Sequence, residues 1–422
     1  MVFVSQEISQ QQSLRVCHPH KRKNSHSLLL ACLRLQASCS ILMLRKIGIL
    51  TFHASHNYGS MLQAYALQTC LERLGCDVTI INYRSFAQKH FYVRPDRQWV
   101  KPFLRAFLTH PHVFLQGIGK WKKFERFMQD KLHLSRELSG VVDVERFIRR
   151  EPRLFEAVIT GGDQIWNLGC TDVSPVFFLP FETPGVRRIS YSVSLGDGNW
   201  WNPTHYAHFL KALVSGYDYP SIREKTDAVL LSDLLMRPVD VVPDPVFLLE
   251  KEDYERLAGD KPRVKGRYIF YYCPQFGRES ASIVATYAKE RGINVVTSNK
   301  HLAREERGFI SCSNAGPVEF LNLLKNASLV CGHSLHLVAL AILLHKPFRA
   351  ISGTKDSRIA NLLDAVGLSS CYLMTVSSSG SIDPFSRSFD FPPIDWSAVD
   401  TKLGTLRQAG LAFLKRALGG EG

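Results

Sequence analysis

The sequence predicts an α/β protein with two Rossmann-like, doubly wound domains that face a cleft, an arrangement similar to GT-B. Short apolar runs bounded by Gly, Ser, Asp or Pro alternate with segments of helical period along most of the 422 residues. This alternation stops at the charged segment 249–265 and then restarts. Alternating strands and helices favour parallel sheets, whose ligands bind beyond the carboxyl ends of the strands.

The first 42 residues do not share this pattern. They are rich in Gln, Ser and His and show no regular period. The apolar run LLLACL follows the basic KRK, but Arg34 interrupts it, which argues against a secretory signal. We expect residues 1–42 to be a disordered or non-native extension.

The first domain is expected at 43–258 and opens with a βαβ unit. KIGILTF is a predicted strand, Ser60 to Leu74 a helix with one apolar face, and DVTIINY a second strand. Further strands are predicted at EAVITGG, RRISYSVS, DAVLLS and VDVVPD.

Within this domain, residues 84–153 form a basic, aromatic, helical insert. It carries sixteen Lys and Arg against seven Asp and Glu, interleaved with Phe, Tyr and Trp. Such a mixture suits peripheral contact with an anionic membrane surface, or surface helices whose aromatic side chains face the protein's own core. Nucleic acid is not an expected partner, because no recognition motif accompanies the charge.

The second domain is expected at 259–422. Predicted strands are RYIFYYC, INVVTS, ASLVCG and FRAIS, and predicted helices are 279–291, 317–325 and 335–345. A last helix, 394–418, is expected to pack back across the domains. Ten cysteines without a CxxC pair argue against a zinc site and favour a reducing cytoplasm.

Two polar loops follow predicted strands and enter the next segment. In HASHNYGS, Asn57 and Gly59 are candidates for binding an anion or a sugar, although a turn that only needs a small residue has the same pattern. In GGDQIWN, the candidates are Gly162, Asp163 and Asn167. Neither loop has the spacing of a dinucleotide or P-loop motif.

Three charged or titratable residues follow later strands. Arg223 can grip a carboxylate or phosphate, and Asp244 can orient a catalytic base or only form a turn. In ASLVCGHSLHLVALAILLHKPF, His336 lies in the first turn of an apolar helix, where the helix dipole favours a neutral imidazole. His333 is a second candidate in the same segment.

These segments together resemble the polysaccharide pyruvyl transferase family. The resemblance is carried, in order, by NYGSMLQAYALQ, GGDQIWN, ISYSVSLG, SIRE, PDPVFLL, the block from GPVEF to LLHKPF, and SRIANLLDAVGL. It implies a GT-B-like fold and transfer of the enolpyruvyl unit of phosphoenolpyruvate to a sugar of an exopolysaccharide or cell-wall precursor. The product would be a pyruvate ketal, with phosphate released and no metal or organic cofactor.

The resemblance also assigns roles to residues. His336 would be a general acid or base, and Arg223, Lys346 and the amides after Gly332 would hold the anionic donor. Gln63 and Ser334 would join the substrate site, while Leu337 departs from the glycine common after the family's histidine. The acceptor sugar can be free or lipid-linked, and a lipid-linked acceptor would bring the protein to the inner face of the membrane.

Two alternatives remain open at this stage. One is a GT-B glycosyltransferase that uses a nucleotide sugar, although the second half lacks the pair of glutamates seven residues apart that retaining members often show. The other is a catalytically silent sugar-binding relative, for which Leu337 is the motivating departure.

Overall fold

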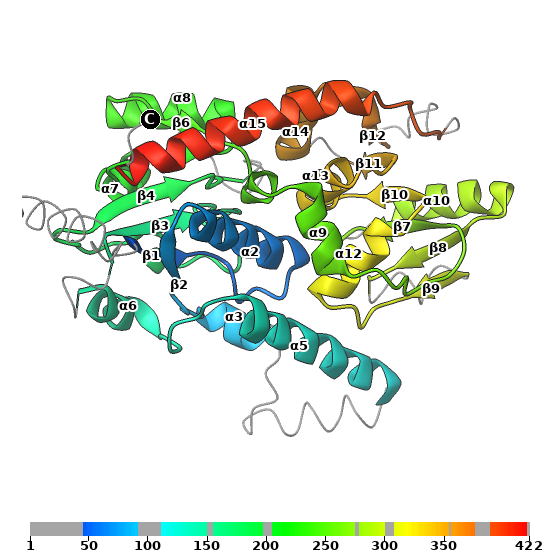
Figure 1. The fold of residues 1–422 in the computed structure, drawn as a ribbon, viewed down its shortest axis with the longest axis horizontal. Coiled ribbons are helices and arrows are strands. Elements are labelled where there is room, and N and C mark those ends of the chain that lie inside the picture. The colour runs from blue at the N-terminus through cyan, green and yellow to red at the C-terminus, as the bar shows by residue number, and fades with distance from the viewer. Residues whose placement is uncertain are drawn as a thin grey trace, which may run out of the picture. The chain divides into compact units, whose positions relative to one another are not determined.

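The computed structural model describes residues 45–91, 111–149, 155–196, 205–274, 278–299, 308–353, 356–375 and 389–419. Contacts divide the chain into two units, Met1–Leu44 and Arg45–Gly422. The predicted extension 1–42 therefore lies outside the described residues, and all elements below belong to the second unit (Figure 1).

The first sheet is parallel and has the order β2-β1-β3-β4, with β1 at Arg45–Leu50, β2 at Cys76–Ile80, β3 at Ala157–Gly161 and β4 at Arg187–Tyr191. Two short strands, β5 (Ser221–Ile222) and β6 (Asp240–Val241), pair in parallel beside it. Isolated bridges join Ile189 to Tyr219 and Val193 to Ile222, so β5 continues the sheet past β4. The strand order reverses between β1 and β3.

The second sheet is also parallel, with the order β12-β11-β10-β7-β8-β9. Its strands are β7 (Tyr268–Tyr272), β8 (Asn294–Thr297), β9 (Phe309–Ser311), β10 (Leu329–Gly332), β11 (Phe348–Ser352) and β12 (Tyr372–Met374). This is the doubly wound order, with its reversal between β7 and β10. The prediction of an α/β protein with two parallel sheets is confirmed.

Helices connect and cover these strands (Figure 1). They are α2 (Tyr58–Arg73), α3 (Phe86–Phe91), α5 (Pro111–Lys131), α6 (Gly140–Arg149), α7 (Ala207–Val214), α8 (Lys225–Leu235), α9 (Lys251–Ala258), α10 (Arg278–Arg291), α12 (Pro317–Lys325), α13 (Leu335–Leu343), α14 (Ser357–Val366) and α15 (Trp396–Ala417), with single turns η2 (Pro175–Phe178), η3 (Pro245–Leu248) and η4 (Ser369–Cys371). None of the described helices has the length and apolar character needed to cross a membrane.

Apolar strand residues alternate between two cores, as the period of a strand requires. In β1, Ile47 and Ile49 pack in the core that contains α2, whereas Leu50 packs with Trp166 on the opposite face. The first of these cores continues into the second half through Tyr58, whose ring stacks on Phe320 with centroids 4.2 Å apart. The two halves of the described chain therefore share buried apolar side chains.

One strand prediction is wrong: DAVLLS forms part of α8, not a strand. Within it, Ala228 and Leu231 are buried three residues apart while Val229 is exposed, which is the spacing of a helix face. A run of four or five apolar residues fits the period of a helix and that of a strand, so the sequence did not distinguish the two structures for this segment. Strands β9 and β12 and helix α9 were not predicted either.

Two helices join the halves. In α15, the Arg407 Nε and Nη2 groups donate to the backbone carbonyls of Phe247 and Leu249 in the η3 segment, and the helix also packs against α14 (Figure 1). In α5, Lys123 pairs with Glu319 of α12 at 3.3 Å.

In the described part of the basic insert, two aromatic side chains of α5 face inward, whereas Phe86 is exposed. Phe124 and Phe127 of α5 are buried in the same core as α2. This agrees with the core interpretation for these two residues. The aromatic residues at 92–107 lie outside the described residues, so the membrane interpretation stays a prediction.

Candidate active site

The reversal points of both sheets lie beside one another. At the first, α2 begins after β1 and the 161–167 loop leaves β3. At the second, β10 ends at Gly332 and leads into α13, whose N-cap residue is Ser334. The close approach of Gly59, in α2, to His336, in α13, joins the two points. Ligands of doubly wound sheets bind in this position.

His336 is nearly buried, with 7% of its surface exposed, and faces Asp244. Its Nε2 lies 3.3 Å from the Asp244 Oδ2 atom. Asp244 is the N-cap of η3, where its Oδ1 accepts from the Val246 amide at 3.1 Å. The sequence had left open whether Asp244 orients a base or only forms a turn, and the geometry allows both at once.

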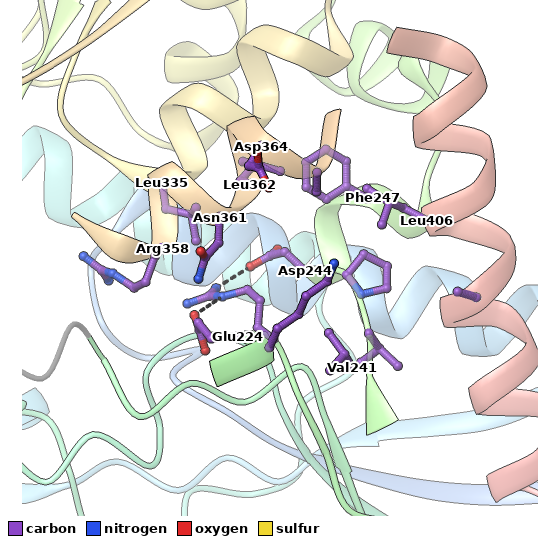
Figure 2. A pocket seen from close by; sticks show the side chains of 16 residues that line it. Glu224, Val241, Asp244, Phe247, Leu335, Arg358, Asn361, Leu362, Asp364 and Leu406 are labelled. Atoms are coloured by element: carbon purple, nitrogen blue, oxygen red, sulfur yellow. Dashed lines mark hydrogen bonds and ion pairs between the residues drawn. The ribbon is translucent and has the colours of Figure 1, made fainter. Parts of the chain in front are cut away.

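Arg223 follows β5 and completes this arrangement. Its Nη1 donates to the same Asp244 Oδ2 at 2.8 Å, and its Nε donates to Glu224 Oε1 at 2.9 Å (Figure 2). Burial opposes ionisation of Asp244, but the charges of His336 and Arg223 and the hydrogen bonds outweigh it and hold the pKa of this carboxyl well below its usual range. Asp244 is therefore a buried, ionised carboxylate shared by a guanidinium and an imidazole.

Gly59 permits the approach of His336. A Cβ atom on Gly59 would overlap the imidazole ring, so a larger residue at this position would displace the histidine. The Asn57 side chain caps α2, with its Oδ1 accepting from the Gly59 amide at 2.8 Å. Both predicted residues thus lie at the site, where the Asn57 side chain caps α2.

The 161–167 loop contacts the start of α2. Gly162 and Asp163 both have φ in the left-handed region, and a Cβ at Gly162 would overlap the Gln63 amide oxygen. Asp163 accepts a hydrogen bond from the Ser60 hydroxyl at 2.6 Å. Gln63 Nε2 donates to the Thr51 hydroxyl at 2.7 Å, while its Oε1 is buried without a partner among the described residues.

The remaining residues of this loop have internal partners. Asn167 Nδ2 donates to Gln164 Oε1 at 2.8 Å, and its Oδ1 accepts from the Gly169 amide at 2.9 Å. Trp166 is fully buried and stacks on Phe178, so it belongs to the core.

His333 lies beside a second buried carboxylate, that of Asp356. His333 Nε2 is 3.5 Å from the Asp356 Oδ2 atom, and Asp356 also binds Arg358 with bonds of 3.1 and 2.7 Å. Ser334 makes no side-chain bond to the helix that it caps. Sequence reasoning missed Asp356 and Arg358 as site residues. The pattern of an Asp before an apolar helix is an N-cap signal that could have located Asp356.

Lys346 does not join these residues. It follows the end of α13, at the opposite edge of the sheet from His336, because a helix of nine residues carries the chain about 14 Å. Burial lowers the pKa of Lys346, as does the charge of neighbouring Lys251, while Glu255 raises it. Its surroundings are thus α9 and the end of α12, away from Asp244.

A cavity of about 140 Å³ adjoins Asp244 on the side of α15 (Figure 2). Its walls are mainly apolar, and its charged residues include Arg223, Glu224, Asp244 and Arg358. Figure 2 shows the head group of Arg358 on the side of the cavity away from Leu406.

We expect Gly59→Ala to destabilise the protein, although alanine is the better helix former, because the new Cβ meets His336. Gly404→Ala in α15, where a Cβ meets no neighbour, should instead raise the free energy of unfolding by roughly 0.5–1 kcal/mol. Denaturant unfolding measures both. In a His336→Ala background the cost of Gly59→Ala should shrink, and an unchanged cost would contradict the proposed contact.

Asp227, in the first turn of α8, gives a pH-dependent prediction. Burial, followed by the charge of Glu224, raises its pKa to about 7. Between about pH 4 and 7 the folded state then holds a proton that the unfolded state loses, so stability falls as pH rises through this range. Asp227→Asn should be more stable than wild type at pH 8 and similar at pH 4, by thermal unfolding. Asp233→Asn, an exposed change in the same helix, should leave the pH profile unaltered.

Solved structures share this fold at low identity. The UDP-GlcNAc 2-epimerase from Methanocaldococcus jannaschii, in complex with UDP-GlcNAc and UDP, is 12% identical with a TM-score of 0.50, covering 90% of this chain and 100% of that one. A putative UDP-N-acetylglucosamine 2-epimerase from Listeria monocytogenes is 11% identical with a TM-score of 0.48, covering 77% and 83%. The glycosyltransferase SnogD from Streptomyces nogalater is 13% identical with a TM-score of 0.39, covering 87% and 94%.

The similarity to the Methanocaldococcus jannaschii enzyme concerns the fold alone, and the two parallel, doubly wound sheets of this chain have a GT-B-like arrangement. A search of curated proteins finds no match. The sequence model of the polysaccharide pyruvyl transferases matches residues 57–354, a range that contains all strands of the two sheets except β1 and β12 and includes Asn57, Asp163, Arg223, Asp244 and His336. That range is most of the chain, and the protein belongs to the polysaccharide pyruvyl transferase family.

Proposed function

We propose that the protein transfers the enolpyruvyl unit of phosphoenolpyruvate to a sugar, giving a pyruvate ketal and releasing phosphate. The family match supports a transferase that modifies polysaccharides. The observation that carries the finer proposal is the pair of His336 and Asp244, at the point where the carboxyl ends of both sheets meet. An imidazole held by a buried carboxylate is suited to moving protons in such a reaction.

The reaction forms two C–O bonds at the same carbon, the first by addition and the second by displacement of phosphate. One sugar hydroxyl adds to C2 of phosphoenolpyruvate while C3 gains a proton and becomes a methyl group. A second hydroxyl then attacks C2, the bond from C2 to the phosphate oxygen breaks, and phosphate leaves with the second proton. In this proposal His336 takes a proton from the attacking hydroxyl and returns a proton to C3.

Asp244 and Arg223 have supporting roles in this scheme. The Asp244 carboxylate fixes the orientation of the His336 ring and stabilises the imidazolium that forms when His336 is protonated. Arg223 holds Asp244 in place through its Nη1. No metal or organic cofactor takes part in the proposal.

The acceptor side is assigned to the polar loop residues. Asp163, Gln164 and Asn167 supply carboxylate and amide groups at the end of β3, and such groups suit sugar hydroxyls. We extend the proposal to a sugar of an exopolysaccharide or cell-wall precursor, including a lipid-linked one. The basic segment 84–153 would then meet anionic lipid, and vesicle binding that high salt does not reduce would count against this extension.

The test is an assay with phosphoenolpyruvate and a panel of free, nucleotide-linked and lipid-linked sugars. It follows phosphate release and the mass of the product. We expect His336→Gln to lower turnover by about 10²–10⁴-fold, because the general acid–base group is removed. Asp244→Asn should also lower turnover. His133 is an exposed histidine that follows α5, and His133→Gln should leave turnover unchanged.

The outcomes separate the alternatives. Phosphate release and a pyruvyl mass gain that both depend on His336 would support the proposal. Turnover of UDP-sugars without phosphoenolpyruvate would replace it with nucleotide-sugar transfer. Sugar binding without turnover of either donor would identify a silent sugar-binding relative.

A further inference from the structure

One buried nitrogen atom at the candidate site, Nη2 of Arg223, has no hydrogen-bond partner among the described residues. Buried polar groups in native proteins are nearly always paired, so an unpaired guanidinium nitrogen beside a cavity indicates a place for a ligand. The neighbouring imidazoles are already held by carboxylates, since Nε2 of His336 lies 3.3 Å from Asp244 and Nε2 of His333 lies 3.5 Å from Asp356. The two carboxylates mark two adjoining clusters of charged side chains, one around Asp244 and one around Asp356.

Arg358 links the two clusters. Its Nε and Nη2 are held by Asp356, and its Nη1 forms no hydrogen bond with another described residue. Burial opposes the charge of Arg358, but Asp356 outweighs it and raises the pKa of this guanidinium group. Arg358 and Arg223 line the same cavity beside Asp244, so their two like charges repel each other within a mostly buried site. An anion between them would offset this repulsion.

The start of α13 adds further donors at the same place. This nine-residue helix begins at Leu335, and the side chain of its N-cap residue, Ser334, forms no capping bond. By contrast, α2 and α14 are capped by Asn57 and Asp356. The cap residue of α13 therefore provides no side-chain oxygen that accepts a hydrogen bond from the first amides of the helix. These amides and the positive end of the helix dipole attract anions such as phosphate.

We propose that Arg358 is a substrate-binding residue that, together with Arg223 and the first turn of α13, holds the phosphate group of the donor. This rests on the proposed function. The unpaired edges of both guanidinium groups, Nη2 of Arg223 and Nη1 of Arg358, can bind phosphate oxygens without breaking the ion pairs to Asp244 and Asp356. Those carboxylates position the guanidinium groups, and Arg358 takes the role that the sequence had given to Lys346.

The experiment measures binding of three probes by calorimetry: phosphoenolpyruvate, inorganic phosphate and pyruvate. Wild type is compared with Arg358→Gln, with Arg358→Lys, and with Arg291→Gln as a charge-matched control on the distant helix α10. We expect Arg358→Gln to weaken binding of phosphoenolpyruvate and phosphate at least tenfold and to change pyruvate binding little. Arg358→Lys should recover part of the affinity, because lysine keeps the charge without the two-pronged geometry.

Circular dichroism and thermal unfolding check that each variant is folded. If Arg358→Gln does not fold, the binding measurements on Arg358→Lys test the inference instead. Phosphate and phosphoenolpyruvate affinities that match wild type in either folded variant would overturn the inference, and the turnover of wild type would then still decide the proposed function. Equal loss of pyruvate binding would assign Arg358 to the carboxylate and also overturn it.

The converse outcome separates the two proposals. Phosphate binding that depends on Arg358, without transfer to any acceptor, would support the anion site while the pyruvyl transfer proposal fails. Absence of phosphate and phosphoenolpyruvate binding in wild type would overturn the inference.

Discussion

The negative charge of Asp244 is the constraint around which the site is arranged. This carboxylate is 3% exposed, and burying an unpaired charge costs far more than a protein can supply. Its compensation comes from three places in the chain: Arg223 after β5, the Val246 amide in η3 and His336 in α13. Removing one partner of such a group typically costs about 3–5 kcal/mol, so the catalytic geometry and the stability of the fold depend on the same contacts.

Both halves contribute charged groups to this site. The first half supplies Arg223 and Asp244, and its glycines Gly59 and Gly162 allow α2 and the 161–167 loop to approach their neighbours closely. The second half supplies His336 and Arg358 near the starts of α13 and α14. The site is therefore complete only when the two halves are packed together.

Part of this could be predicted from the sequence. The long strands and α2 follow from apolar period, and His336 was located because a strand and then a glycine precede an apolar helix. Asp244 was a candidate for orienting a base, but its pairing with His336 could not be predicted, and Asp356 and Arg358 were missed, since these residues come together only through tertiary packing. Lys346 was misleading for a similar reason: it is near His336 in sequence, but α13 carries it to the other edge of the sheet. In α8 a short apolar run fitted both strand and helix.

The last described helix has a consequence for how the protein folds. Arg45, in the first described strand, donates to the carbonyl of Leu418 at 2.7 Å, and Arg187 in β4 donates to Ala417 at 3.1 Å. These contacts join residues 373 and 230 positions apart in the sequence. Contacts between such distant parts of a chain form slowly, because the loop between them must close first, so we expect the first sheet to reach its full stability only after α15 has docked.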